Sequence, residues 1–433
     1  MIYAEKLSKM IQCETISVPD VPNTDKFDKF HTLLEELFPL VFSKGEVHYI
    51  DSSILIKWCG KGKAEPILLM SHQDVVPAEG EWKYPPFSGE IKEDRVWGRG
   101  TVDTKGSLMC IFQSIEELME EGYTPEGDVY IASSSTEEVA GSGAPKTVEW
   151  LKEHNVRLQF LMDEGGMIVD EPMAGVKGRY AMIGTMEKGT GNIKVIARST
   201  GGHASAPEKN PPMSRHSAFS NDMETKNPNK LEFTSTVLEM FKRLGPQAKG
   251  VLGFAMRHAK LLSPILKKVL PAVSAKGAAM LRTTMAWTMY SGSSARNVIP
   301  ESAWVNINTR FIIHQGIDET KKILQPYLDK YNLEAEYINC HEPQTPVDHN
   351  GKAFKTVEET VKEIYPGVIP SPYVMTGGTD AYYYAPVTDN AIRFAPLYID
   401  SQQLGSIHAK DENIFVSSLP KGIEFYKAII KKM

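Results

Sequence analysis

Residues 67–74 run Ile67-Leu68-Leu69-Met70-Ser71-His72-Gln73-Asp74, a compact apolar stretch that ends in side chains able to bind a metal ion. Two later stretches, residues 129–138 and 160–164, have the same form, with acidic side chains after the apolar run. Between the first and the second, residues 104–121 carry apolar side chains at helical spacing. Strands and helices that alternate in this order predict an α/β fold with a mostly parallel, twisted sheet covered by helices.

The polar ends of these strands are candidates for a metal site. In parallel α/β sheets, ligands bind beyond the carboxyl ends of the strands, which share one edge. The side chains concerned are His72 and Asp74, Glu137 and Glu138, Asp163 and Glu164, with Asp103 and His408 in two loops. Two histidines and three carboxylates, one of them shared, suit a pair of divalent cations. In the absence of thiolates this set fits Zn2+ best, with Co2+ or Mn2+ as possible substitutes.

The composition excludes several classes of protein. The 433 residues are 42% hydrophobic and 24% charged, with a net charge of −6, which is unlike a basic nucleic-acid-binding protein. The four cysteines form no close pair, so we expect neither a disulfide framework nor a cysteine zinc site. Met1–Gln12 predicts an amphipathic helix without the apolar stretch of a signal peptide, and no apolar run is long enough for a membrane span. We therefore expect a soluble, cytoplasmic protein.

A second unit interrupts this sheet. Residues 192–198 and 304–312 alternate like strands, and long helical stretches lie between them. We expect an inserted α+β lid or dimerisation domain at 187–340, with the catalytic domain formed by 1–186 and 341–433. Residues 256–290, rich in Met, Leu and Ala, suit either a membrane contact or helices that pack in a lid or subunit interface. The lysines that interrupt this segment favour packing, so no membrane partner is expected.

Six segments, spread over most of the chain, carry a family resemblance: Ser71–Pro77, Trp97–Gly106, Thr136–Glu138, Met162–Gly166, Gly201–Ser205 and Ile407-His408. In this order they resemble the M20 metallopeptidases, zinc-peptidase-like hydrolases with two co-catalytic zinc ions that include aminoacylase, acetylornithine deacetylase and carboxypeptidase S. Gly377–Ala381 and the long insert before Asn297 resemble most the carboxypeptidase S branch.

The resemblance implies two Zn2+ per chain. His72 and Asp163 would hold one ion, Glu138 and His408 the other, and Asp103 would bridge them. In this scheme all five ligands come from the catalytic domain.

The resemblance also implies roles for residues beside the metals. Asp74 would orient His72, and Glu137 would be the general base that activates the metal-bridging water and then protonates the leaving amine. His203, which dimeric relatives supply from the partner subunit, would stabilise the oxyanion. Asn297 and Arg310 would bind the carboxylate end of the substrate.

The predicted function is hydrolysis of a peptide or N-acyl-amino-acid amide bond near a free carboxylate, and the expected partner is a second copy of the chain, bound through the inserted domain. An alternative is a dedicated small-molecule deacylase such as acetylornithine deacetylase or succinyl-diaminopimelate desuccinylase. A non-catalytic metal-binding relative is a further alternative, although Glu137 argues against it because a binding protein needs no base. One departure from the family pattern is Tyr382, where relatives commonly carry Arg.

Overall fold

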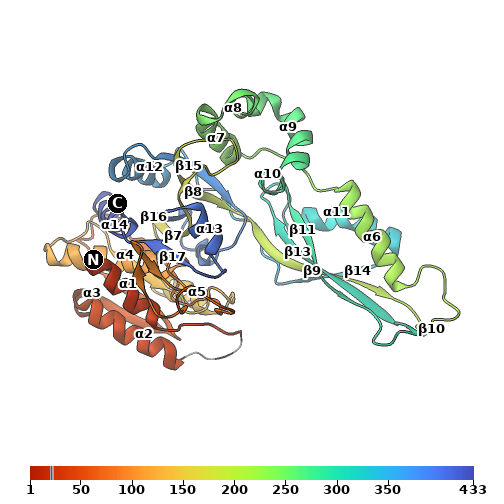
Figure 1. The fold of residues 1–433 in the computed structure, drawn as a ribbon, viewed down its shortest axis with the longest axis horizontal. Coiled ribbons are helices and arrows are strands. Elements are labelled where there is room, and N and C mark those ends of the chain that lie inside the picture. The colour runs from red at the N-terminus through yellow and green to blue at the C-terminus, as the bar shows by residue number, and fades with distance from the viewer. Residues whose placement is uncertain (20, 22–23) are drawn as a thin grey trace.

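The computed structural model describes residues 1–19, 21 and 24–433, and its largest element is an eight-stranded sheet in the order β1-β2-β6-β3-β7-β16-β8-β15 (Figure 1). The strands are β1 (Glu46–Ile50), β2 (Ser53–Trp58), β3 (Ile67–Met70), β6 (Val129–Ser133), β7 (Phe160–Asp170), β8 (Arg179–Glu187), β15 (Ile369–Met375) and β16 (Ala391–Ile399). β3 runs parallel to β6 and β7, β16 is parallel to β7, and β15 is parallel to β8. The predicted strand ranges are confirmed, except that β7 continues well beyond Met162.

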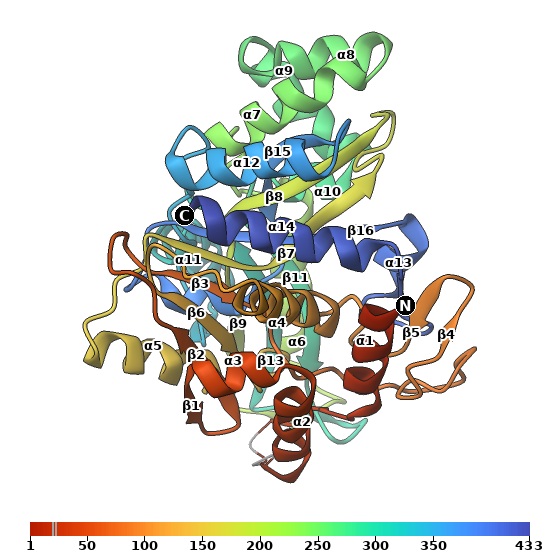
Figure 2. The same cartoon turned by 90° about the vertical axis from the view of Figure 1, so that its left-hand side faces the viewer.

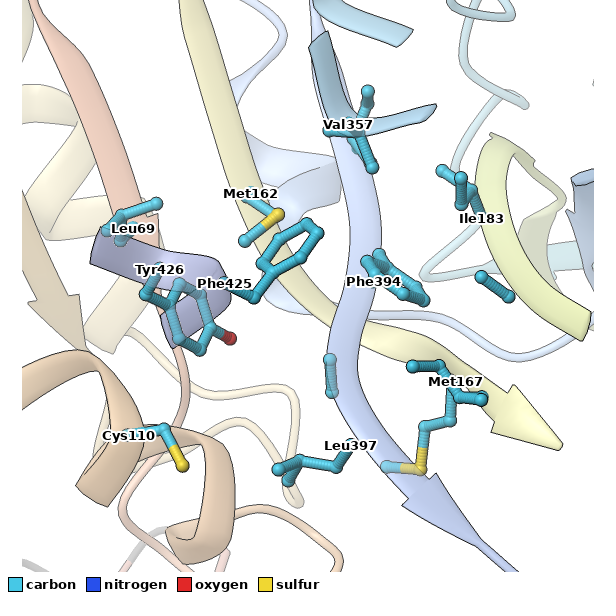
Figure 3. Packing of buried hydrophobic residues seen from close by; sticks show 14 of the residues in the cluster. Leu69, Cys110, Met162, Met167, Ile183, Val357, Phe394, Leu397, Phe425 and Tyr426 are labelled. Carbon is cyan, nitrogen blue, oxygen red and sulfur yellow. The ribbon is translucent and has the colours of Figure 1, made fainter. Parts of the chain in front are cut away.

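The apolar runs are continuous because both faces of the sheet are buried. In β3, Ile67 and Leu69 belong to one hydrophobic cluster, whereas Leu68 and Met70 belong to a second cluster on the opposite face. On the first face, Leu69, Met162 and Phe394 lie around the aromatic rings of Phe425 and Tyr426 (Figure 3).

Helices cover both faces of the sheet (Figures 1 and 2). The first face carries α1 (Ile2–Gln12), α4 (Lys105–Glu120), α12 (Lys352–Ile364) and α14 (Ser418–Lys432). Two shorter segments pack against each other on the second face, α5 (Gly143–Glu153) and the 3-10 helix η2 (Asp380–Tyr384). The N-terminal helices α2 (Thr24–Leu37) and α3 (Pro39–Lys44) flank α1 and α4. A three-stranded sheet, β17 (Asn413–Phe415), β5 (Arg95–Trp97) and β4 (Ile91–Lys92), completes this part.

A second sheet extends away from the first (Figure 1). Its order is β11-β13-β9-β14, with bounds β9 (Gly189–Arg198), β11 (Thr284–Ser291), β13 (Ser302–Phe311) and β14 (Glu334–Ile338). Its apolar side chains form a separate cluster with those of α6 (Pro212–Lys226) and α11 (Ile317–Tyr331). The far tip holds the short pair β10 (Gly202–His203) and β12 (Val298–Ile299). Only Lys188 separates β8 of the first sheet from β9 of the second.

Four more helices follow α6 along the chain, and the first three of them contribute side chains to the core cluster of the large sheet. They are α7 (Ser235–Leu244), α8 (Gly250–Arg257), α9 (Ala259–Val273) and α10 (Ala275–Ala279). The helices predicted for this stretch are therefore present. Met240 and Leu244 of α7 join the core cluster of the large sheet, and α7 contacts β15. No helix within the described ranges is both long and apolar enough to cross a membrane.

Candidate metal centre

Three adjacent strands deliver polar side chains to one edge of the large sheet. β3 lies between β6 and β7, so the carboxyl ends of these parallel strands point the same way. His72 follows β3 and Glu138 follows β6, whereas Asp163 lies inside the longer β7. Glu137 and Glu138 lie in a turn that precedes α5, and not in the first turn of a helix.

His72, Asp103 and Glu138 offer ligand atoms that all lie within 4.8 Å of one another. His72 Nε2 lies 3.0 Å from Asp103 Oδ1. His408 Nε2 lies 3.0 Å from Asp103 Oδ2 and 3.1 Å from Glu138 Oε2. The Asp103 carboxylate therefore lies between two imidazoles, where a carboxylate shared by two cations would lie.

Asp74 connects the His72 strand to the glutamate pair. His72 Nδ1 donates to the backbone carbonyl of Asp74 at 2.9 Å and lies 3.4 Å from its Oδ1, which leaves Nε2 free to face Asp103. The Asp74 carboxylate also accepts the backbone N–H groups of Glu137 and Glu138 at 3.2 and 3.1 Å. Ser17 donates to it at 2.7 Å. One buried carboxylate thus fixes the relative positions of an imidazole and two glutamates.

The loop that carries Asp103 is held by Glu412, a residue that sequence reasoning missed. Glu412 is fully buried, and its Oε1 accepts the N–H groups of Val102 and Asp103 at 2.8 and 3.0 Å. Its Oε2 accepts from Arg99 Nη1 at 2.7 Å and from the N–H of Gly100 at 3.0 Å. A lone glutamate far along the chain gave no signal in the sequence, because only the fold brings it under this loop.

His408 is positioned by the short helix that precedes it. α13 (Ser401–Ser406) begins with a capping box, in which Asp400 Oδ1 accepts from the N–H of Gln403 at 2.8 Å and Gln403 Oε1 accepts from the N–H of Asp400 at 2.9 Å. His408 itself adopts φ of 56°, a left-handed conformation that is uncommon outside glycine. The helix end and this turn direct the imidazole toward Asp103 and Glu138.

Asp163 and Glu164 occupy different environments. The Asp163 carboxylate accepts the N–H groups of Glu164 and Ala381, both at 2.8 Å. Glu164 Oε1 lies 3.8 Å from His72 Nε2, and a second candidate ligand group contains His72, Glu137 and Glu164. Both groups of ligand atoms found among the described residues omit Asp163, so Glu164 joins the candidates for a cation ligand.

A buried network fixes the loop that contacts Asp163. Arg393 Nε donates to Glu187 Oε2 at 2.8 Å, and Glu187 accepts from the backbone and side chain of Thr379 at 3.2 and 3.1 Å. Arg393 also donates to Gln344, whose amide contacts the carbonyls of Ala381 and Tyr382. Gly377–Ala381, the segment that resembles the carboxypeptidase S branch, is thereby held against β7.

The imidazoles of the centre favour protons when only carboxylates surround them. Burial disfavours the charged form of His72, but hydrogen bonds with Asp103 and Asp74 raise its pKa well above its ordinary value. Hydrogen bonds with Asp103 and Glu138 raise the pKa of His408 to about 10. Excess negative charge at this edge therefore attracts positive charge, from protons or from cations.

The pKa values of several buried acids of the centre are raised as well. Burial raises the pKa of Glu137 well above its ordinary value, and the nearby Glu164 adds to this shift. Burial raises the pKa of Asp163 to about 6 and, with Asp163 beside it, that of Asp380 to about 8. Shifts of this kind cluster at functional sites, where burial and like charges converge.

The residues present fit a metal centre. Glu138 Oε1 is buried, and no hydrogen-bond partner for it exists within residues 1–19, 21 and 24–433. An unpaired buried carboxylate oxygen is costly, and a coordinated cation would satisfy it. The surrounding donors are imidazole and carboxylate, the set preferred by Zn2+ and similar divalent ions.

The other predicted residues lie away from this cluster. His203 is exposed on β10 at the far tip, where its Nδ1 lies 2.8 Å from Ser205 Oγ (Figure 1). Asn297 lies at the same tip, and its carbonyl accepts from the N–H of Ala204 at 2.9 Å. Arg310 lies near the opposite end of β13, opposite Thr190 in β9. The structure thus brings His203 and Asn297 together, and neither contacts the metal cluster of its own chain within the described residues.

Comparison with known proteins extends over nearly the whole chain. Residues 68–432 match the peptidase family M20/M25/M40. The chain is 30% identical over 443 residues to a probable carboxypeptidase S-like 2 of Dictyostelium discoideum, covering 99% of this chain and 84% of that one. It is also 30% identical to the N-fatty-acyl-amino acid synthase/hydrolase PM20D1 of Xenopus tropicalis, over 99% and 85% of the two chains. The fold matches an M20 family metallo-carboxypeptidase of Sulfolobus solfataricus with a TM-score of 0.73 at 17% identity, over 99% and 98% of the two chains.

Proposed function

Because the chain belongs to peptidase family M20/M25/M40 and is a metal-dependent hydrolase of amide bonds, we propose that it cleaves a peptide or N-acyl-amino-acid bond next to a free carboxylate. The observation that carries the proposal is the placement of Asp103 between His72 and His408, with Glu138 beside it. This arrangement supports two cations that share one carboxylate, and its donors suit Zn2+.

Five side chains would hold the pair of cations: His72 and Asp163 for one, Glu138 and His408 for the other, and Asp103 between them. Glu164 is a second candidate beside His72, because its Oε1 lies 3.8 Å from His72 Nε2, whereas both oxygens of Asp163 accept backbone N–H groups. When bound, such cations polarise the scissile carbonyl and make water more acidic.

Glu137 is the general base in this proposal. Its backbone is fixed by Asp74, and its side chain lies in the second group with His72 and Glu164. It takes a proton from the attacking water and returns it to the leaving nitrogen, so the amine departs neutral. Cations beside Glu137 would oppose the effect of burial and keep it ionised at neutral pH.

The oxyanion is stabilised by His203 of a partner subunit. Within one chain His203 and Asn297 lie together at the far tip, away from the metal cluster. A homodimer formed through the inserted domain would bring that tip to the partner's centre. Asn297 would then bind the substrate carboxylate across the interface, whereas Arg310 would act from the same chain.

We place the domain boundaries at 1–186, 187–340 and 341–433. Support comes from the crossings between sheets: Lys188 links β8 to β9, and the chain returns where the N–H of His341 donates to Thr190 at 2.8 Å. Within 187–340, α7, α8 and α9 contribute side chains to the core of the large sheet, which supports the second sheet with α6 and α11 as the movable part of the lid.

We expect the enzyme to prefer substrates that carry an apolar acyl group or side chain next to the scissile bond. His341, Tyr382 and Tyr383 form a partly exposed aromatic cluster, with ring centroids 5.1 Å apart for His341 and Tyr382 and 5.4 Å apart for the two tyrosines. Burial raises the pKa of Tyr383, and the charges of Asp380 and Glu137 add to this shift, which supports a position of the cluster near the proposed base. Tyr382 stands where other members of the family commonly carry Arg. With Tyr382 and Tyr383, the wall of the proposed site is therefore apolar and aromatic at this position.

The proposal is tested with metal-loaded protein and a panel of dipeptides, N-acetyl amino acids and long-chain N-acyl amino acids. We expect release of the free amino acid, fastest from substrates with an apolar acyl or side chain. Preference for N-acetylornithine or N-succinyl-diaminopimelate would favour a dedicated deacylase. No hydrolysis of any member, with two cations verified per chain, would contradict the proposal and favour a metal-binding protein.

A further inference from the structure

Helix α9 displays a continuous apolar ridge to solvent. Leu261, Ile265, Val269 and Val273 follow one another at intervals of four and are 80%, 60%, 45% and 71% exposed. Residues spaced by four lie above one another along one side of a helix. Exposed apolar side chains are common singly, but a row along a helix marks a contact surface.

The neighbouring helix α8 also exposes large apolar side chains. In α8, Val251 is 85% exposed and Phe254 is 53% exposed. On the side of α9 that faces the protein core, Leu266 and Leu270 already pack against the main hydrophobic cluster. The exposed row is therefore additional to what the fold requires. We call the exposed residues of α8 and α9 the apolar ridge.

The charge around the apolar ridge has one sign. No Asp or Glu occurs between Glu239 and Glu301, although the whole chain has a net charge of −6. Lys260 and Lys268 are exposed on α9, and Arg257 is exposed at the end of α8. An acid-free, basic segment with large apolar side chains is typical of helices that lie in the surface of an anionic membrane.

The position of the hairpin suits a flat partner. α8 and α9 lie at an extremity of the molecule in both views, beyond α7 and away from the second sheet (Figures 1 and 2). An extended surface can therefore approach the ridge without meeting the rest of the molecule. A second copy presenting the same ridge would bring basic groups against basic groups, which disfavours self-association.

We propose that the α8–α9 hairpin docks the protein on anionic phospholipid surfaces, with the apolar ridge inserted among the acyl chains and the basic residues at the headgroups. The helices lie on the membrane and do not span it, so the lysines that interrupt the segment remain at the headgroups. This revises the expectation that the protein has no membrane partner. Docking would also bring the metal centre close to amphiphilic substrates, a consequence that rests on the proposed function.

The test is co-sedimentation of the full-length protein with vesicles. Phosphatidylcholine vesicles containing an equal part of phosphatidylglycerol should bind the protein, and vesicles of phosphatidylcholine alone should bind it at least about tenfold more weakly. Added salt should weaken binding. The inactive variant Glu137→Gln should bind as the parent does, so failure of docking is distinguishable from failure of catalysis.

Two variants and matched controls locate the surface. Leu261→Ser with Ile265→Ser should reduce partition about tenfold or more, as should Lys260→Glu with Lys268→Glu. The apolar control is Met289→Ser with Ile338→Ser, which changes two exposed residues of the second sheet. The charge control is Lys63→Glu with Lys322→Glu. Both control variants should bind vesicles as the parent does.

Three results would overturn the proposal: equal binding to both vesicle types, ridge variants that bind like the parent, or no vesicle binding at all. Sedimentation velocity without vesicles tests the alternative that a second copy of the chain covers the apolar ridge. A dimer that the ridge variant dissociates would identify the surface as a subunit interface and overturn membrane docking.

Discussion

The metal centre and the tip of the second sheet differ in how their polar groups are satisfied. At the centre, Asp74 and Glu412 are fully buried and accept several hydrogen bonds each, which fixes the loops that carry the candidate ligands. At the tip, His203 is exposed, and its Nδ1 lies 2.8 Å from Ser205 Oγ and accepts the N–H of Ser205. The buried contacts fix the centre within one chain, whereas the exposure of His203 is consistent with the proposed role of the tip at a partner's centre.

The largest expected effect separates catalysis from metal binding at the centre. Glu137→Gln removes the proton acceptor but keeps the backbone contacts to Asp74, so kcat should fall by about a thousandfold. Metal content, measured by elemental analysis, should stay the same as in the parent. A kcat equal to that of the parent would contradict the proposed mechanism.

Glu412→Gln tests whether the buried scaffold of the centre matters for cation binding. The amide NH2 of a glutamine cannot accept, so it would face backbone N–H donors of the Asp103 loop. Competition with a chelator should show cation affinity lowered by about 10- to 100-fold. The exposed acid Glu359, changed to Gln, serves as a control that leaves affinity unchanged. Parental affinity in Glu412→Gln would show that the loop holds its shape without this carboxylate.

The pH dependence of cation binding tests the charge balance of the centre. In the cation-free protein the pKa of His408 is raised to about 10, and that of His72 is raised as well. A cation must displace these protons, so affinity should rise with pH below 10 and weaken on acidification, about tenfold per pH unit for each proton displaced. A cation affinity that is flat between pH 6 and 9 would contradict the shifts.

The smallest expected effect concerns the aromatic cluster of His341, Tyr382 and Tyr383. Tyr383→Ala should lower kcat/KM for long-chain N-acyl amino acids about fivefold to tenfold and change it little for N-acetyl amino acids. Tyr290→Ala, on the exposed face of β11, is the matched control. Equal losses on both substrates would mean that Tyr383 positions the loop and does not select the acyl group.

The sequence predicts elements whose pattern is local and misses contacts that only the fold creates. The apolar runs before His72, Glu137 and Asp163 predicted three parallel strands, because a strand buried on both faces is continuously apolar. Glu412 escaped prediction, since a single acid in a loop carries no periodicity. The same holds for the pairing of Arg393 with Glu187, which are separated by 206 residues.

The helices after Leu231 show a second limit of sequence patterns. Their helical spacing was evident, but spacing does not say which sheet a helix covers. α7 packs on β15 because its apolar face meets the edge of the large sheet, although its neighbours in sequence belong to the second sheet. The exposed ridge of α9 likewise emerges only when the buried side is known.

The most direct test of the central claim, that one chain's centre is completed by another chain's tip, is complementation between two inactive variants. Glu137→Gln lacks the base and His203→Ala lacks the oxyanion donor, and each alone should lose at least about a hundredfold in kcat while retaining its cations. When the two proteins are mixed and exchange subunits, the account predicts recovered activity, because the mixed dimer contains one centre with an intact Glu137 and an intact partner His203. Full activity of His203→Ala alone, or a mixture as inactive as its parts after verified subunit exchange, would contradict the account.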